Sequence, residues 1–206
     1  MKMLAVSTSA KLPSAAILLD DRSIALSEDK SGRPHSVSLM HLVDDLLNDN
    51  GVEPSEIDIF AVDVGPGSFT GVRIGVSIIN AMAYALSKPV IAVPSLCALR
   101  HLSDSKEQVV AMLDARNGNG YAAAFQGESC ILEPCACVKS EIIENYCKDA
   151  ELVGDCCGRH DQSNAKLVIL EALAMLQKND DDVKVRSAVP LYLRPSQAER
   201  MKKTDN

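Results

Sequence analysis

The sequence predicts an α/β protein whose mixed sheets are flanked by helices, and three observations lead to this prediction. Short apolar runs of strand length alternate with longer segments in which apolar residues recur every three or four positions. Turn signals such as Asp20-Asp21 and Asn50-Gly51 separate these segments. The chain has 206 residues, of which 47% are hydrophobic and 24% charged, so it can bury a sizeable core and is not a disordered chain.

The first half of the chain is expected to form a sheet with two helices. A helix over residues 35–50 is predicted because Leu39, Val43 and Leu46 fall on one stripe. A second helix, over residues 70–86, follows a glycine-rich stretch and ends before a Lys-Pro pair. Strands are expected at residues 3–8, 14–19, 23–27, 57–64 and 90–93.

The second half of the chain shows fewer clear patterns. A polar stretch predicts a boundary between an N-terminal lobe of residues 1–104 and a C-terminal lobe of residues 105–206. The glycines and asparagines at residues 117–120 predict a hairpin turn, and the charged residues 201–206 are expected to be a mobile tail. The remaining expected elements are a helix at 96–102, strands at 109–113 and 121–125, and a helix at 167–176.

Charge and cysteine content restrict the classes of function. A net charge of −7 disfavours nucleic-acid binding by this chain alone, because such binding depends on Lys and Arg side chains that neutralise phosphates. Seven cysteines, an odd number without C-x2-C spacing, favour reduced thiols over a disulfide framework or a zinc site. Neither a signal-peptide core nor a membrane-spanning apolar run is evident, so we expect a cytoplasmic protein.

The most informative stretch is GPGSFTGVRIG at residues 65–75, between an apolar strand and a helix. Its glycines allow a sharp turn and a close approach of backbone N–H groups to an anion, although neither a Walker loop nor a clean G-x-G-x-x-G is present. The alternative is structural: Ser68 or Thr70 caps the helix, and the glycines permit close packing. The residues that would lie near a nucleotide are Gly65, Gly67, Ser68, Thr70, Gly71 and Arg73.

This stretch resembles the signature of the TsaB (YeaZ) family. Two further blocks agree with that resemblance: Asp114-Ala115-Arg116, and the PLYLRP string at residues 190–195. The resemblance implies two lobes of the actin-like, sugar-kinase and chaperone ATPase (ribonuclease H-like) fold. It also implies a subunit of the machinery that makes tRNA threonylcarbamoyladenosine. Residues 127–185 contribute little to it.

Set beside that family, the chain shows no evident reaction centre. TsaD-type relatives hold a metal through two histidines four residues apart on a helix, whereas here only His101 is present and no ligand stands four residues before it. ATPases of the fold place an Asp after the first strand, where this chain has Ser7-Thr8-Ser9. His160 beside Cys156 and Cys157 lacks an orienting third residue, so neither catalytic residues nor a metal site are expected. Asp63, on the strand before the glycines, is expected to cap the loop or face solvent.

The two helices of the first half carry more apolar surface than one face of a sheet requires. The alternative is a wide core stripe. Methionines in such a face can repack against different partners. The expected partner interface consists of Val37, Met40, Val43, Val76, Ile78, Ile79 and Met82.

The resemblance then implies the following function. The chain would be a non-catalytic subunit that binds a TsaD-type catalytic subunit and supports threonylcarbamoyl transfer to adenosine 37 of tRNA. A TsaE-type ATPase would join the assembly, tRNA would be contacted only through the complex, and ATP or ADP would bind at the interface rather than tightly to this chain. Alone, the chain would form a homodimer. The alternatives are an active ATPase or peptidase of the same superfamily, or a homodimeric scaffold for another partner.

Overall fold

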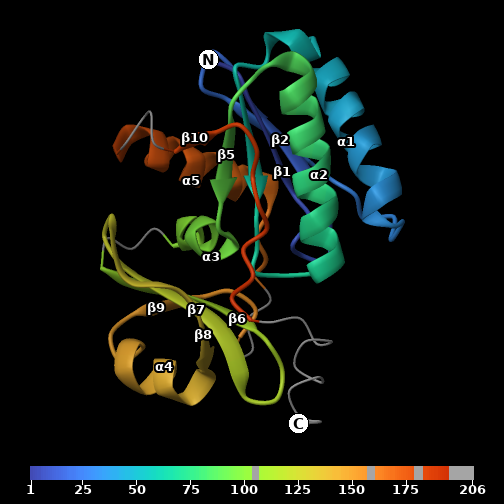
Figure 1. Cartoon of the computed structure of the whole chain (residues 1–206). Helices are drawn as coiled ribbons and strands as arrows, with labels where there is room; N and C mark the ends of the chain where they lie inside the picture. The colour runs from blue at the N-terminus through green and yellow to red at the C-terminus, as the bar shows by residue number, and fades with distance from the viewer. Residues whose placement is uncertain (104–106, 157–160, 179–182, 195–206) are drawn as a thin grey trace.

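The computed structural model describes residues 1–103, 107–156, 161–178 and 183–194. Two β-sheets lie one above the other in Figure 1, with helices on the outer side of each sheet and further helices between them. The expected tail at residues 201–206 lies outside the described residues.

The first sheet contains six strands in the order β10-β5-β4-β1-β2-β3. The first three strands form an antiparallel meander, β4 and β5 run parallel to β1, and β10 pairs with β5 in the antiparallel sense. The strands are β1 (Met3–Ser7), β2 (Ser14–Leu18), β3 (Ile24–Glu28), β4 (Ile59–Asp63), β5 (Val90–Val93) and β10 (Lys184–Val185).

Alternation along the strands divides the core into two layers. Leu4 and Val6 face the outer helices α1 (His35–Asp49) and α2 (Phe69–Leu86), whereas Met3 and Ala5 face the second sheet. A short 3-10 helix, η1 (Pro54–Glu56), precedes β4. Figure 1 shows α1 and α2 side by side on the outer face of the first sheet.

The second sheet has the order β8-β7-β6-β9. Its strands are β6 (Gln108–Asp114), β7 (Asn119–Gln126), β8 (Ser129–Val138) and β9 (Glu151–Val153), and α4 (Lys139–Tyr146) covers its outer face. A meander followed by a strand parallel to its first member also describes β3-β2-β1-β4. The two halves therefore share one topology, although no sequence repeat is visible.

The layer between the sheets contains α3 (Ser95–Leu99), the 3-10 helix η2 (Arg100–Leu102) and α5 (Ala165–Lys178). Helix α5 contacts β1, β2 and β4 of the first sheet. The expected lobe of residues 105–206 is therefore corrected: α5 and β10 follow the boundary in sequence but pack on or extend the first sheet. Strand β10 pairs with β5 in the antiparallel sense, and α5 packs on the apolar inner face of the first sheet.

Candidate functional site

A buried carboxylate organises the turn from β4 into α2. Asp63 is fully buried, and its carboxylate accepts hydrogen bonds from Ser7 Oγ at 2.8 Å, Ser9 Oγ at 2.6 Å and Ser95 Oγ at 2.5 Å. The Gly65 N–H adds a fourth at 2.9 Å. Four neutral donors satisfy this charge in place of a cation. Asp63 thus caps the loop, as one of the two expectations had it, and does not face solvent.

The glycines of the loop allow α2 to lie against the segment that follows β1. A Cβ on Gly67 would stand 2.5 Å from the Ser9 carbonyl oxygen, and one on Gly71 would stand 2.0 Å from the Thr8 carbonyl oxygen. Ser68 caps α2, because its Oγ accepts a hydrogen bond from the Gly71 N–H at 3.2 Å. Close packing and helix capping therefore account for these residues.

A cleft of about 400 Å³ opens between the two sheets beside this loop. Of the six residues predicted to lie near a nucleotide, only Gly67 and Ser68 line it. Gly65 and Gly71 are buried in the turn, and Thr70 is exposed outside the cleft lining. The loop's proximity to a nucleotide stays a prediction.

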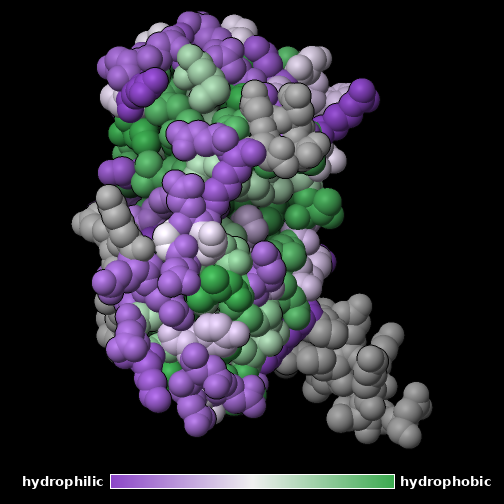
Figure 2. All heavy atoms as spheres, turned by 90° about the vertical axis from the view of Figure 1, so that its left-hand side faces the viewer, coloured by the Kyte–Doolittle hydropathy of each residue, from purple (hydrophilic) through white to green (hydrophobic). Residues whose placement is uncertain are grey.

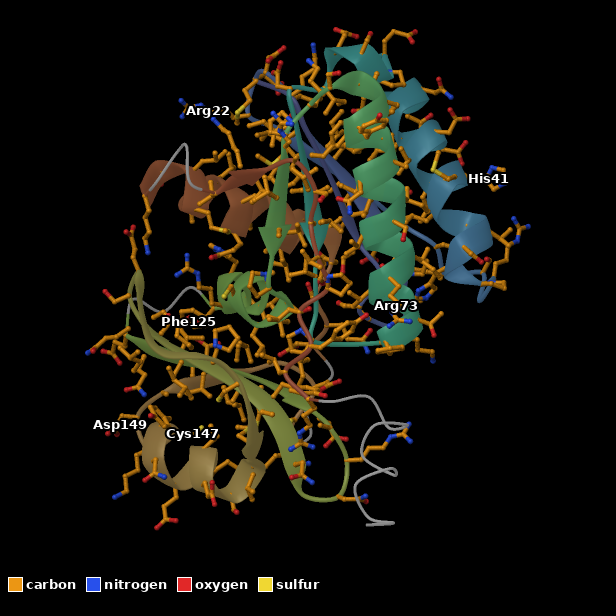
Figure 3. The ribbon with its side chains drawn as sticks, in the orientation of Figure 1. Arg22, His41, Arg73, Phe125, Cys147 and Asp149 are labelled. Atoms are coloured by element: carbon orange, nitrogen blue, oxygen red, sulfur yellow. The ribbon has the colours of Figure 1, made fainter. Side chains whose placement is uncertain are left out.

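The sixth residue, Arg73, belongs to an exposed aromatic cluster on α2. Its Nε donates to Tyr192 Oη at 2.7 Å, and its guanidinium lies 3.9 Å from the Phe69 ring centroid. The Phe69 and Tyr192 rings are 5.2 Å apart. Figure 3 shows Arg73 at the N-terminal end of α2. The side chain therefore fastens the segment after β10 to α2.

The seven expected interface residues on α1 and α2 fall into two groups that differ in exposure. Val37 is 51% exposed and Met40 45% exposed, while Ile78 and Met82 are half-buried. The remaining three belong to the core beneath the helices and are not available to a partner: Val43, Val76 and Ile79.

This correction has a simple cause. Helical periodicity identifies a stripe of apolar residues, but a stripe wider than the sheet contact includes both core and surface positions. Two exposed aromatic residues on α2 were missed, Phe69 and Tyr84, the latter 87% exposed. Phe69 stands within the glycine-rich stretch, and Tyr84 lies two residues before the end of α2 at Leu86.

Helix α2 is strongly apolar but only partly buried. It is the one helix of the described residues that is long and apolar enough to cross a bilayer, a criterion that core helices of soluble proteins also meet. Only 33% of its residues are buried within this chain. Figure 2 shows the left-hand side of Figure 1, away from α1 and α2, where hydrophilic side chains are interrupted by apolar areas.

Two of the three described histidines make polar contacts within the chain. His101 Nε2 lies 2.7 Å from Glu171 Oε2, whose carboxylate also accepts from Arg100 Nε at 2.8 Å. His41 points outward from α1 (Figure 3), and His35 Nε2 lies 3.2 Å from the Lys11 carbonyl oxygen. Within the described residues, no group of three or more His, Cys, Asp or Glu side chains could hold a metal ion. His160 and Cys157 lie outside those residues.

The strand order β3-β2-β1-β4-β5, with an antiparallel meander followed by two parallel strands, defines the ribonuclease H-like sheet of the actin-like ATPase fold. Its partial repetition in the second sheet gives the two-lobed form of that class. Two solved structures from Pseudomonas aeruginosa share this fold. One is YeaZ, with a TM-score of 0.75, and the other is described as similar to peptidase YEAZ, with a TM-score of 0.79. Both are 25% identical to this chain, and they align over 93% and 94% of it and 99% of their own lengths.

Sequence comparison narrows the class to a family. The TsaB protein of Bacillus subtilis is 30% identical over 97% of this chain and 96% of its own length. The TsaB protein of Escherichia coli is 33% identical over 61% of this chain and 55% of its own length. A family model described as TsaD, tRNA N6-adenosine threonylcarbamoyltransferase, matches residues 29–155. The chain belongs to the TsaB (YeaZ) family, whose members are named for tRNA threonylcarbamoyladenosine biosynthesis.

Proposed function

We propose that this chain is a non-catalytic, cytoplasmic subunit that binds a TsaD-type catalytic subunit and supports threonylcarbamoyl transfer to adenosine 37 of tRNA. One observation carries the proposal: α2 has the apolarity of a membrane span, yet two thirds of its residues are not buried by this chain. A soluble protein gains by covering such a face with a partner.

The chemistry of the face suits an exchangeable protein partner. Met40 on α1 and Met82 on α2 are flexible and polarizable, so they can repack against a TsaD-type subunit or a second copy of this chain. Phe69 and Tyr84 add aromatic side chains of the kind that dominate binding energy at interfaces. Exposed His41 and Asp45 supply a polar rim on α1.

The hydrogen bonds of the turn favour a non-catalytic role over a peptidase. A serine nucleophile needs a base within hydrogen-bond reach. It must also be accessible to the substrate, whereas Ser7, Ser9 and Ser95 are buried and their hydroxyls all donate to one carboxylate, that of Asp63. Each oxygen of the Asp63 carboxylate accepts two hydrogen bonds within the chain, which disfavours a role as a magnesium ligand.

The remaining parts of the proposal concern the assembly. A TsaE-type ATPase joins the complex, ATP or ADP binds at the interface between subunits, and tRNA contacts this chain only within the complex, in keeping with its net charge of −7. In the absence of the TsaD-type subunit, the same apolar face pairs two copies of this chain.

Co-purification with the TsaD-type subunit of the same organism tests the proposal. The double variant Met40→Asp, Met82→Asp places two charges in the expected interface and is predicted to weaken association by roughly a hundredfold or more. Ile143→Asp is the matched control, because Ile143 is 41% exposed on α4 of the other sheet. Equal association of the double variant and the control would contradict the proposal.

A turnover assay separates the alternatives. The isolated chain is expected to show no hydrolysis of ATP or of a peptide above the background of the Asp63→Ala variant. Robust turnover by the unaltered chain would replace the non-catalytic assignment with that of an active enzyme.

The association experiment also compares the two partners. If the Met40→Asp, Met82→Asp variant lost self-association but still bound the TsaD-type subunit, the two partners would use separate surfaces.

A further inference from the structure

The cleft between the two sheets has no role in the proposed function. One wall consists of the segment after β1, with Lys11, and the first residues of α2, with Ser68. The opposite wall contains Asp114 at the end of β6 and Asp155 after β9. Ser163, just before α5, also lines it. A volume of about 400 Å³ falls in the range of small-molecule sites.

Two buried polar atoms of residues that line the cleft have no hydrogen-bond partner among the described residues. They are Ser163 Oγ and His35 Nδ1. Ser163 is only 5% exposed, so bulk water does not easily replace the missing partner. Both atoms are enclosed by the protein, so they mark polar residues in the wall of the cleft and are not contacts already open to a ligand.

The charges on the walls indicate the kind of ligand. Lys11 supplies a positive charge on the wall that also contains the N-terminal end of the 18-residue helix α2. On the opposite wall, the ammonium group of Lys139 lies 2.7 Å from the Asp114 carboxylate and neutralises it, which also lowers the pKa of Asp114. Asp155 accepts the Asp114 N–H at 2.7 Å and pairs with no cation among the described residues.

The described walls therefore carry one uncompensated cation on one side and one uncompensated carboxylate on the other. A triphosphate would bring several negative charges towards Asp155 with one described lysine to balance them, so it fits poorly. A molecule that is itself neutral overall, with separated opposite charges, fits both walls.

We propose that this cleft binds a small zwitterionic amino acid. Its carboxylate would lie towards Lys11 and the start of α2, and its ammonium group towards Asp155. The cleft is argued from its own residues, whereas the choice of L-threonine as the probe rests on the proposed function, because threonine is the amino acid of the transferred group.

Calorimetric titration of the full chain with L-threonine tests the site. We expect one molecule to bind per chain, and Asp155→Asn to weaken binding at least tenfold through loss of the charge-assisted hydrogen bond. Asn keeps an oxygen for the Asp114 N–H, so the fold is expected to survive, and thermal unfolding checks this. Asp149→Asn is the matched control, since Asp149 is exposed beyond α4 and away from the cleft (Figure 3).

Three outcomes would overturn this site. One is the absence of binding by both L-threonine and L-serine at millimolar concentrations, and another is equal affinity of the Asp155→Asn and Asp149→Asn variants. The third is displacement of L-threonine by ATP with magnesium, which would show a nucleotide cleft instead. The Met40→Asp, Met82→Asp variant is expected to bind L-threonine normally, so failure of the cleft and failure of the partner surface are distinguishable.

Discussion

Helices α2 and α5 occupy equivalent positions in the two repeated halves, and their surroundings differ. Each follows the fourth strand of its half, β4 or β9, and each is rich in apolar residues. Helix α5 crosses to the first sheet and is enclosed between the two sheets, where Val168 and Ile169 are fully buried. Helix α2 remains on the outside of its own sheet with most of its residues outside the core.

This difference separates two uses of an apolar helix. The residues of α5 stabilise the junction of the two lobes within one chain. Those of α2 stabilise nothing comparable on their outer side, and their apolarity supports the proposal that another chain covers this surface. Composition alone does not distinguish the two helices, whereas their places in the fold do, because α5 lies between the sheets and α2 lies on the outer side of one sheet.

The largest expected effect compares the same substitution in both helices. Ile169→Asp would bury an unpaired carboxylate between the sheets and is expected to lower the free energy of unfolding by about 5 kcal/mol, enough to unfold many domains. Ile78→Asp, at a half-buried position of α2, is expected to lower the free energy of unfolding by about 1 kcal/mol or less. Urea denaturation measures both, and similar losses would remove the distinction between the helices.

A second effect concerns the turn that starts α2. Asp63→Ala would leave the donors of Ser7, Ser9, Ser95 and Gly65 without their acceptor and is expected to cost about 3 kcal/mol. Asp45→Ala, on the exposed side of α1, is the control and is expected to be nearly neutral. If the two variants unfold at the same urea concentration, the carboxylate does not organise this turn.

A smaller loss of stability is expected where α2 packs against the segment after β1. A Cβ at Gly71 meets the Thr8 carbonyl oxygen at 2.0 Å, so Gly71→Ala is expected to cost about 2 kcal/mol as the helix shifts outward. Ser77→Ala, at an exposed position of the same helix, should change stability by less than about 0.5 kcal/mol. Stabilisation by Gly71→Ala would contradict the close packing described for the loop.

The smallest expected effect is a difference in reactivity between two thiols, Cys97 in the layer between the sheets and Cys130 on the edge strand β8. Burial raises the pKa of Cys97 on α3 far above its usual range, and a smaller rise from the same cause affects exposed Cys130. Because the thiolate is the reactive form, alkylation at pH 8 is expected to be at least roughly tenfold slower at Cys97. Peptide mapping by mass spectrometry measures the two rates, and rapid labelling of Cys97 would show that the layer between the sheets opens readily.

Much of the first half could be predicted from the sequence because its signals are local. The strands β1 to β5 and the helices α1, α2 and α5 show strong alternation or helical periodicity, and the structure confirms them within a few residues. Strand β8 is an edge strand with few buried side chains, and β9 and β10 contain three and two residues held by pairing with β6 and β5. No local pattern announces such strands, so they were missed.

The site was predicted less well because its contacts join distant segments. The serine hydroxyls around Asp63 come from β1 and from the residues after β5, and Tyr192 meets Arg73 across 119 positions. The glycine signature located the turn, and its structural interpretation was confirmed. Which apolar residues of α1 and α2 stay exposed depended on the width of the sheet beneath them, which periodicity does not reveal.

Methyl NMR of the chain with labelled methionines tests the partner surface most directly. On addition of the TsaD-type subunit, the Met40 and Met82 methyl resonances are expected to shift or broaden because they lie on the outer helices. The Met3 and Met112 resonances report the fully buried interior and are expected to stay in place. Unchanged Met40 and Met82 signals in a complex that has demonstrably formed would contradict the account.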